Sequence, residues 1–232
     1  MRWDLLTRSA HACPDPWPLL RNKGKTGSGA CLHLVIHGRS GGRIPDCLQR
    51  LSAAVADCRG TPVHLEVLTA ERRSPAKFLT PSQTQWLVPL LLLPGSHVRN
   101  DVPQIRNRMQ REGSNVHTLP FLGSWECWWM LMSSWITNLS VQHPSLALVH
   151  HPLRPGLSSR FLSSLQHRFD LPVVSFDVWN QFSRDHPQVI PLPFSLAPNR
   201  MSEALRQVGG LPSLLENSEL RQGLIHCLAE LP

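Results

Sequence analysis

The chain has 232 residues, of which 41% are hydrophobic and 17% charged, so it is long enough to bury a core and is not composed like a disordered protein. The formal net charge of +7 and the pI of about 9.7 favour an anionic partner. The basic residues are scattered without a dense run, which argues against a nucleic-acid-binding arm.

The six cysteines form no Cys-x-x-Cys pair, and we expect them to be the reduced thiols of a cytoplasmic protein. The first residues do not resemble a signal peptide, because Asp4 and Arg8 interrupt the only apolar start. The longest apolar run, residues 86–94, is far shorter than the ~20 residues that span a bilayer. The sequence therefore predicts no association with a membrane.

Residues 1–30 are rich in proline, glycine, serine and lysine, and we expect them to form a flexible leader. The Gly-Lys-Thr at residues 24–26 suggests a phosphate-binding P-loop. That motif needs a glycine five residues earlier, where Leu19 stands, and a buried strand before it. Both are missing, so a P-loop is not expected.

From Cys31 onward, short apolar runs alternate with stretches of helical periodicity. The expected strands are residues 32–36, 62–68, 87–93 and 115–119. The expected helices are residues 44–58, 75–85, a stretch that follows Asp101 with Pro103 in its first turn, and residues 125–139. This alternation predicts an α/β fold with a parallel sheet covered on both faces.

The second half repeats the pattern more faintly. Its expected strands are residues 146–151, 173–176 and 190–196, and its expected helices are residues 158–169 and a stretch from Met201. We therefore expect two similar lobes, residues 31–140 and 145–232, joined near residues 142–145.

Two histidines occupy the position where ligands collect in parallel sheets, beyond the carboxyl ends of the strands. His37 ends the first expected strand, and His97 lies just past the third. Neighbouring strands lie about 4.8 Å apart, so both imidazoles can reach one ion if these strands are adjacent or separated by one. A lone histidine after a strand is more often a loop residue, but two at matching strand ends, each in a glycine-containing turn, leave a shared ion or ligand site open.

The turns that carry these histidines also hold glycine and arginine. Gly38 and Gly95 would let a bulky planar ligand approach the backbone. Arg39, Arg43 and Arg99 lie nearby, either as solvated surface charges or as groups that bind carboxylates in fork geometry.

Three segments together resemble a known family. Residues 34–38, Leu-Val-Ile-His-Gly, and residues 92–103, Leu-Leu-Pro-Gly-Ser-His-Val-Arg-Asn-Asp-Val-Pro, resemble the paired signatures of the class II chelatases, the sirohydrochlorin cobalt- and ferrochelatases. Residues 119–123, Leu-Pro-Phe-Leu-Gly, resemble that family's strand-to-helix turn. The resemblance covers about residues 31–137 well and 145–210 weakly.

The resemblance implies two flavodoxin-like lobes with a cleft between them. It implies an enzyme that inserts Fe²⁺ or Co²⁺ into sirohydrochlorin or a related polycarboxylated tetrapyrrole, in siroheme or cobalamin biosynthesis, without a permanently bound cofactor. The catalytic and metal-binding histidines would be His37 and His97. We expect the tetrapyrrole to contact Gly38, Arg39, Arg43, Gly95, Ser96 and Arg99.

Elementary chemistry agrees with this assignment. Metallation must bring in the ion, remove its waters and take two protons from the pyrroles. Neutral imidazole is a suitable ligand for Fe²⁺ or Co²⁺, and its pKa of about 6.5 lets it accept a proton at cellular pH.

The chain departs from the family pattern at the end of the second expected strand. Many members have an acidic residue there, where this chain has Val-Leu-Thr at residues 67–69. Glu66 or Glu71 could serve as the acidic metal ligand instead, depending on the register of the strand.

The second lobe is expected to be degenerate. His151 corresponds to His37, but Asn199 falls near the position of His97, so this lobe should shape the cleft without a full metal pair. An accessory metal site at His150 and His151 stays open. Four tryptophans, at positions 125, 128, 129 and 135, are expected to pack at a lobe or subunit interface.

Two alternatives to the chelatase remain. A protein that binds a tetrapyrrole or a metal without turnover would fit the missing acidic residue. A hydrolase could use His37 and Gly38 as an oxyanion-hole turn, but the chain lacks the Gly-x-Ser-x-Gly nucleophile elbow. The sequence leaves open whether the protein is a monomer or a homodimer, and which metal it would use.

Overall fold

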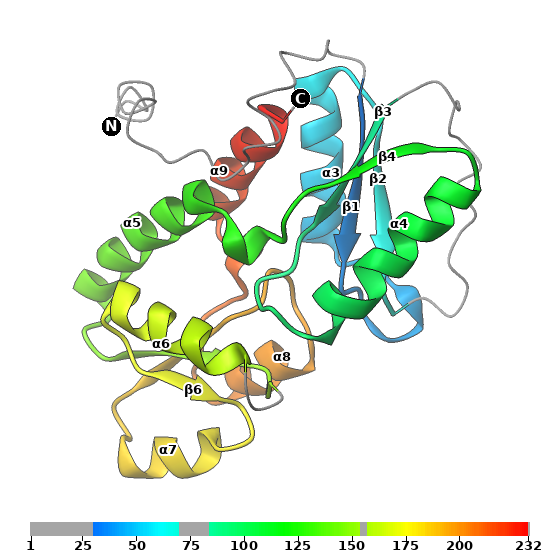
Figure 1. Ribbon diagram of the computed structural model, residues 1–232. Helices are drawn as coiled ribbons and strands as arrows, with labels where there is room; N and C mark the ends of the chain where they lie inside the picture. The colour runs from blue at the N-terminus through cyan, green and yellow to red at the C-terminus, as the bar shows by residue number, and fades with distance from the viewer. Residues whose placement is uncertain (1–29, 70–83, 154–156, 232) are drawn as a thin grey trace.

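Figure 1 shows a computed structural model of the protein, which describes residues 30–69, 84–153 and 157–231. Almost all of the expected leader, residues 1–30, lies outside the described residues. The same holds for most of the helix expected at residues 75–85.

The first sheet has four parallel strands in the order β2-β1-β3-β4. These strands are β1 (Cys31–Ile36), β2 (Val63–Val67), β3 (Thr84–Pro89) and β4 (Asn115–Thr118). Every residue of the central strand β1 is buried, as expected for a strand covered on both faces. The expected parallel α/β arrangement is confirmed.

Helices cover this sheet from opposite sides (Figure 1). On one side, α3 (Asp46–Arg59) packs apolar side chains onto the face of β1 that carries Leu32 and Leu34. It ends at Gly60, which adopts a left-handed conformation with φ of 62°. On the other side, α4 (Val102–Arg111) packs onto the face that carries Val35.

The second sheet repeats the central part of the first. Its three parallel strands, β5 (Leu146–His150), β6 (Val173–Ser175) and β7 (Ile190–Pro193), lie in the order β6-β5-β7. In both sheets, the first strand therefore lies between the second and the third. This shared order confirms the expectation of two similar α/β lobes.

The first half ends with α5 (Glu126–Gln142), and α6 (Leu157–Phe169), α7 (Trp179–Asp185) and α8 (Arg200–Gln207) belong to the second half. The last helix, α9 (Ser218–Ala229), returns to the first sheet and packs against α3 and α5 (Figure 1). The exact limits of the two lobes remain a prediction. One continuous hydrophobic cluster contains buried residues of both lobes.

The tryptophans of α5 contribute to that continuity. Trp129 is buried and lies 6.0, 5.8 and 6.2 Å, ring centre to ring centre, from Phe161, Phe169 and Phe194, which all belong to the second half. Its Nε1 donates a hydrogen bond to Gly123 O at 3.1 Å. Trp129 thus packs between the lobes, which is one of the two positions expected for the tryptophans, and Trp125, Trp128 and Trp135 are buried as well.

The structure corrects one strand and adds two helices. The third strand was expected at residues 87–93, but β3 occupies Thr84–Pro89, so Thr84 and Gln85 are strand rather than the end of a helix. The run is apolar throughout, so periodicity could not fix its register. The sequence did not predict α7 or α9. Within the described ranges, every helix is too short or too polar to cross a bilayer.

Candidate functional site

His37 and His97 meet at the carboxyl end of the first sheet. They follow β1 and β3, which are direct neighbours, and Leu90 N–H still donates to Val35 O at 2.9 Å where β3 ends. The two imidazole ring centres lie 5.0 Å apart, with the ring planes inclined at 70°. The structure thus brings together the two histidines selected from the sequence, at a separation that allows both to contact one ion.

A π-helical turn, His97–Asp101, holds His97 in place. Its backbone closes through Val102 N–H, which donates to His97 O five residues back. The turn brings Asp101 Oδ2 to 2.7 Å from His97 Nδ1. A carboxylate at this distance accepts a hydrogen bond from Nδ1–H. The Nε2 lone pair of His97 therefore remains available for a metal ion or a proton.

The environment of His37 favours the neutral imidazole. Partial loss of water around the ring lowers the pKa of His37, and the neighbouring imidazole of His97 lowers it further. A neutral ring carries a free lone pair, which a metal ion requires. His37 is therefore suited to bind a cation at neutral pH.

These residues line a cavity of about 690 Å³ between the two lobes. Its walls come from the ends of β1 and β3 on one side and of β5 and β7 on the other, with mainly apolar contacts from segments 90–94 and 194–198. A largely apolar cavity with a few convergent polar groups is typical of a site for an organic ligand. None of the lining residues that the structure describes is acidic.

The second lobe contributes a third imidazole. His151 lines the cavity, and its Nε2 lies 3.2 Å from Asn199 Nδ2. Burial is the main cause that lowers the pKa of His151, and the nearby imidazoles of His37 and His150 lower it further. His151 and Asn199 thus lie beside each other in the second lobe, as His37 and His97 do in the first.

His150 turns away from this arrangement. Its ring is buried, and Nδ1 lies 2.7 Å from the carbonyl oxygen of His151. His150 does not line the cavity, so an accessory metal site at His150 and His151 remains a prediction.

The expected substrate-binding residues separate into two groups. Gly38, Gly95, Ser96 and Arg99 line the cavity, and Arg99 Nη2 donates to Pro94 O at 3.0 Å. Arg39 and Arg43 do not line it.

Arg39 spans the two lobes instead. Its guanidinium forms an ion pair with Glu203 of α8 and donates to Pro198 O.

The two glycines of the histidine turns differ in what surrounds them. A Cβ on Gly38 would lie 2.3 Å from Val67 Cγ1 and 3.2 Å from Arg43 O. A Cβ on Gly95 would meet Leu153 Cδ2 at 3.8 Å, an ordinary contact distance. Gly38 is therefore required for close packing of its turn against β2, whereas Gly95 leaves open space at the cavity.

Glu66, one of the two residues considered as an acidic metal ligand, lies away from the histidine pair in this structure. Both of its carboxylate oxygens accept from Arg108 of α4, at 3.1 and 3.0 Å, and it does not line the cavity. The register Val35↔Glu66 places its side chain on the α4 side of the sheet. Glu71 lies outside the described residues.

The residue that the sequence analysis missed is Asp101. We expected it only to precede a helix, but it makes no side-chain cap, and its carboxylate instead orients His97. The His-x-x-x-Asp spacing was the available signal, because residues four apart face each other on a helical turn.

Solved chelatase structures share this architecture. SirB from Bacillus subtilis with Fe³⁺ is similar over 88% of this chain and 95% of its own, with a TM-score of 0.60 and 15% identity. SirB from Bacillus subtilis subspecies spizizenii in complex with cobalt gives a TM-score of 0.54 at 17% identity, over 88% and 96% of the two chains.

CbiX, the terminal enzyme for biosynthesis of siroheme in denitrifying bacteria, is similar over 88% of this chain and 100% of its own, with a TM-score of 0.59 and 16% identity. No family model and no curated protein matches the sequence. At these identities, the likeness establishes the fold of the class II chelatases.

Proposed function

We propose that this chain, which has the class II chelatase fold, inserts a divalent metal ion into a tetrapyrrole of the sirohydrochlorin type. One observation carries the proposal: two imidazoles, 5.0 Å apart, line a cavity of about 690 Å³ between two lobes. A metal-binding pair beside a space suited to an organic ligand is what metallation requires.

In the first step, His37 and His97 replace water molecules of the incoming ion. Neutral imidazole is a suitable ligand for Fe²⁺ and Co²⁺. Two nitrogen ligands occupy only two coordination positions of the ion, so the remaining positions are open to the pyrrole nitrogens. The lowered pKa of His37 keeps its lone pair available while the ion is held.

In the second step, the macrocycle loses two pyrrole protons as its four nitrogens take the ion. His97 is placed to accept these protons, because its Nδ1 contact with the Asp101 carboxylate at 2.7 Å leaves the Nε2 lone pair available. The ion moves from imidazole to pyrrole nitrogens, and two protons pass by way of His97 to solvent. Charge balances without an oxidant or a reductant.

The macrocycle would lie against the apolar cavity wall, with its carboxylates near positive groups. Arg99 lines the cavity, and Arg43 lies in the turn that follows His37. Arg39 would contribute only if it released Glu203. The absence of acidic groups among the described lining residues favours a polycarboxylated ligand over a cationic one.

The finer assignment follows from the same chemistry. We propose sirohydrochlorin as the substrate, Fe²⁺ or Co²⁺ as the ion, and the cytoplasm as the place, with a role in siroheme or cobalamin biosynthesis. Likeness to structures solved with iron and with cobalt supports both ions equally. Lyase chemistry of this kind needs no resident cofactor, and the active form could be a monomer or a homodimer.

The test is an anaerobic assay of sirohydrochlorin with Fe²⁺ or Co²⁺, followed by absorbance. The wild-type chain should metallate the macrocycle well above the spontaneous rate, and His37→Ala should return the rate close to that background. His167→Ala is the matched control, because His167 is exposed on α6 and does not line the cavity. A wild-type rate equal to background would overturn the proposal.

A second candidate is a carrier that binds a tetrapyrrole or a metal without turnover. The absence of a carboxylate among the described cavity-lining residues favours it, since Glu66 is occupied by Arg108. The same assay separates the two functions. A carrier would bind sirohydrochlorin, with a shift in its spectrum, and leave the metallation rate unchanged.

A further inference from the structure

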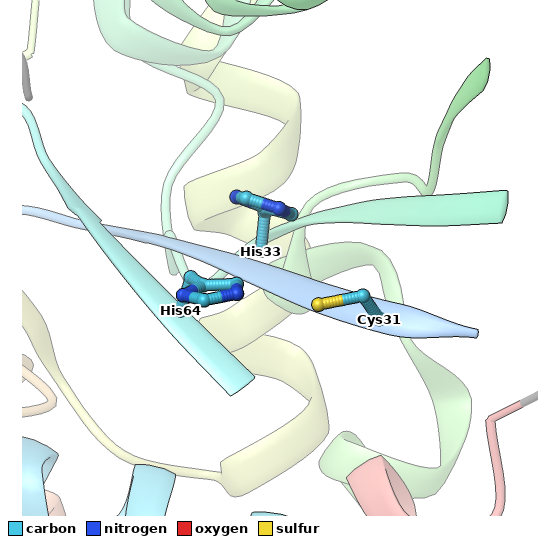
Figure 2. A group of neighbouring side chains, drawn as sticks. All are labelled: Cys31, His33 and His64. Atoms are coloured by element: carbon cyan, nitrogen blue, oxygen red, sulfur yellow. The ribbon is translucent and has the colours of Figure 1, made fainter. Parts of the chain in front are cut away.

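A second group of metal-binding side chains lies at the opposite end of the first sheet. Cys31 and His33 project from β1 and His64 from the neighbouring β2 (Figure 2). Cys31 begins β1, whereas His37 follows its other end, and a six-residue strand spans roughly 20 Å. The group is therefore separate from the cavity that holds His37 and His97.

Strand periodicity explains why these three residues converge. Cys31 and His33 are two residues apart, so their side chains share one face of β1, and His64 is the direct partner of His33 in the ladder. Their ligand atoms all lie within 4.8 Å of one another. The His33 and His64 ring centres lie 4.9 Å apart, with the planes inclined at 31°.

The polar atoms of the group are incompletely paired. His33 is only 6% exposed, and its Nε2 has no hydrogen-bond partner. Gln85, the ladder partner of Cys31 on β3, is fully buried, and neither atom of its amide has a partner. Buried polar groups are almost always satisfied, so unpaired atoms on His33 and on the ladder partner of Cys31 offer contacts to a bound ligand.

We propose that Cys31, His33 and His64 bind a transition-metal ion of the Zn²⁺ class, with Gln85 beside the fourth coordination position. One thiolate and two imidazoles suit Zn²⁺, which forms bonds of about 2.3 Å to sulfur and about 2.0 Å to nitrogen. Tetrahedral ligands at those lengths lie roughly 3.5 Å apart, so small side-chain rotations within the group would complete the site.

The charges in the group are compatible with a cation. Burial raises the pKa of the Cys31 thiol to about 11, opposed by Arg59, and its Sγ donates to Pro62 O. A coordinated thiol ionises, so binding releases one proton from Cys31 and leaves a thiolate that offsets part of the metal charge.

The imidazoles need lose no proton on binding. Burial lowers the pKa of His33 to about 4, followed by the effects of His64 and Arg108, so the ring is neutral at physiological pH. Burial also lowers the pKa of His64. The positive charge of Arg108 is balanced by its ion pair with Glu66.

The site would tie β1 to β2 as a structural centre, and it does not depend on the proposed catalytic function. The experiment uses the full chain with His37→Ala and His97→Ala, so that the cavity histidines cannot bind the probe. After treatment with a chelator, Co²⁺ is added and the near-ultraviolet thiolate-to-cobalt charge-transfer absorption is titrated, and Zn²⁺ is then used to displace it.

We expect the absorption to saturate at one equivalent of Co²⁺ and to disappear in Cys31→Ser. In His64→Asn, the affinity for Co²⁺ should fall by more than about tenfold. A loss of about tenfold is what removal of an outer-shell partner already costs. Cys47→Ser is the matched control, because Cys47 is a buried cysteine on α3 in the opposite core, and it should leave the absorption unchanged.

Circular dichroism verifies that each variant is folded. If His33→Ala fails to fold, Cys31→Ser and His64→Asn still decide the result. The proposal is overturned if the parent chain shows no charge-transfer absorption, or if Cys31→Ser retains it.

Discussion

Individual side chains of the site have tasks that their residue types alone do not reveal. Asp101 precedes α4, where the sequence analysis gave it no further role, yet its carboxylate lies 2.7 Å from His97 Nδ1. Glu66 was a possible metal ligand, yet it holds Arg108. In both cases the partner was decided by which face of an element the side chain occupies, and for Glu66 a one-residue change in strand register would have altered it.

The role of Asp101 leads to a prediction about Asp101→Asn. The amide keeps the size of the side chain but loses the negative charge that orients the His97 ring through its Nδ1–H, so the metallation rate should fall by about 10–100-fold. Thermal stability should change little, since asparagine has nearly the size of aspartate and is equally favoured at the start of a helix. Initial rates and melting curves would check this, and an unchanged rate in the variant would exclude Asp101 from positioning His97.

Burial of His33 predicts a loss of stability in acid for the metal-free chain. The unfolded histidine takes up a proton near pH 6.5, whereas folded His33 stays neutral down to about pH 4. Stability from this group is therefore complete above about pH 6.5 and falls as the pH drops, by about 2 kcal/mol at pH 5.

Urea unfolding with a chelator present, at pH 7.5 and pH 5, measures this difference. His33→Leu removes the titrating group and should reduce the pH dependence by the same amount. Equal pH dependence in the two chains would show that folding does not lower the pKa of His33.

At the scale of elements, the sequence predicted where most strands lie, but it did not predict the register between neighbouring strands. Apolar runs bounded by turns located β1, β2, β4 and β5 within one or two residues. The uniform run at residues 86–94 gave no such limits. The chain leaves the sheet after Pro89, and Leu90–Leu93 become wall of the cavity instead of strand.

The convergence of His37 and His97 was predictable for the same reason as the strands. Both follow apolar runs, and carboxyl ends of parallel strands share an edge. The pairing of Cys31, His33 and His64 was not predictable, because it depends on the register between β1 and β2. Neither the short α7 nor the later α9 was identified from the sequence pattern.

The turns that carry the histidines predict opposite results for two glycine substitutions. Gly38→Ala would drive a Cβ into Val67 and should destabilise the fold by about 1–3 kcal/mol. Gly95→Ala meets only Leu153 at 3.8 Å and should change stability by less than about 0.5 kcal/mol.

Chemical denaturation of both variants measures the difference. Gly95→Ala should nevertheless weaken sirohydrochlorin binding, because the added methyl group enters the cavity. Equal stability of the two variants would contradict the close packing at Gly38.

At the scale of the molecule, the two lobes pack directly against each other. The last helix, α9, lies against α3 and α5, and Arg59 of α3 donates to the carbonyl oxygens of Leu228 and Ala229. Trp129 fills the space between the lobes. The cavity depends on this arrangement, because each lobe supplies only part of its wall.

We therefore expect a single cooperative unfolding transition, and a large loss of stability in Trp129→Ala. Removing a buried tryptophan costs about 3–5 kcal/mol. Trp129→Phe keeps most of the ring contacts and should retain more of the stability. Calorimetry would check both expectations, and two resolved transitions in the wild-type chain would mean that the lobes fold independently.

The central claim is that His37 and His97 act together on one metal ion. The direct measurement is the initial rate of anaerobic sirohydrochlorin metallation by wild type, His37→Ala, His97→Ala and the double variant, each corrected for the spontaneous rate. Residues that act as a unit are strongly non-additive, so the double variant should be no slower than the slower single variant. Single variants that keep the wild-type rate would contradict the claim.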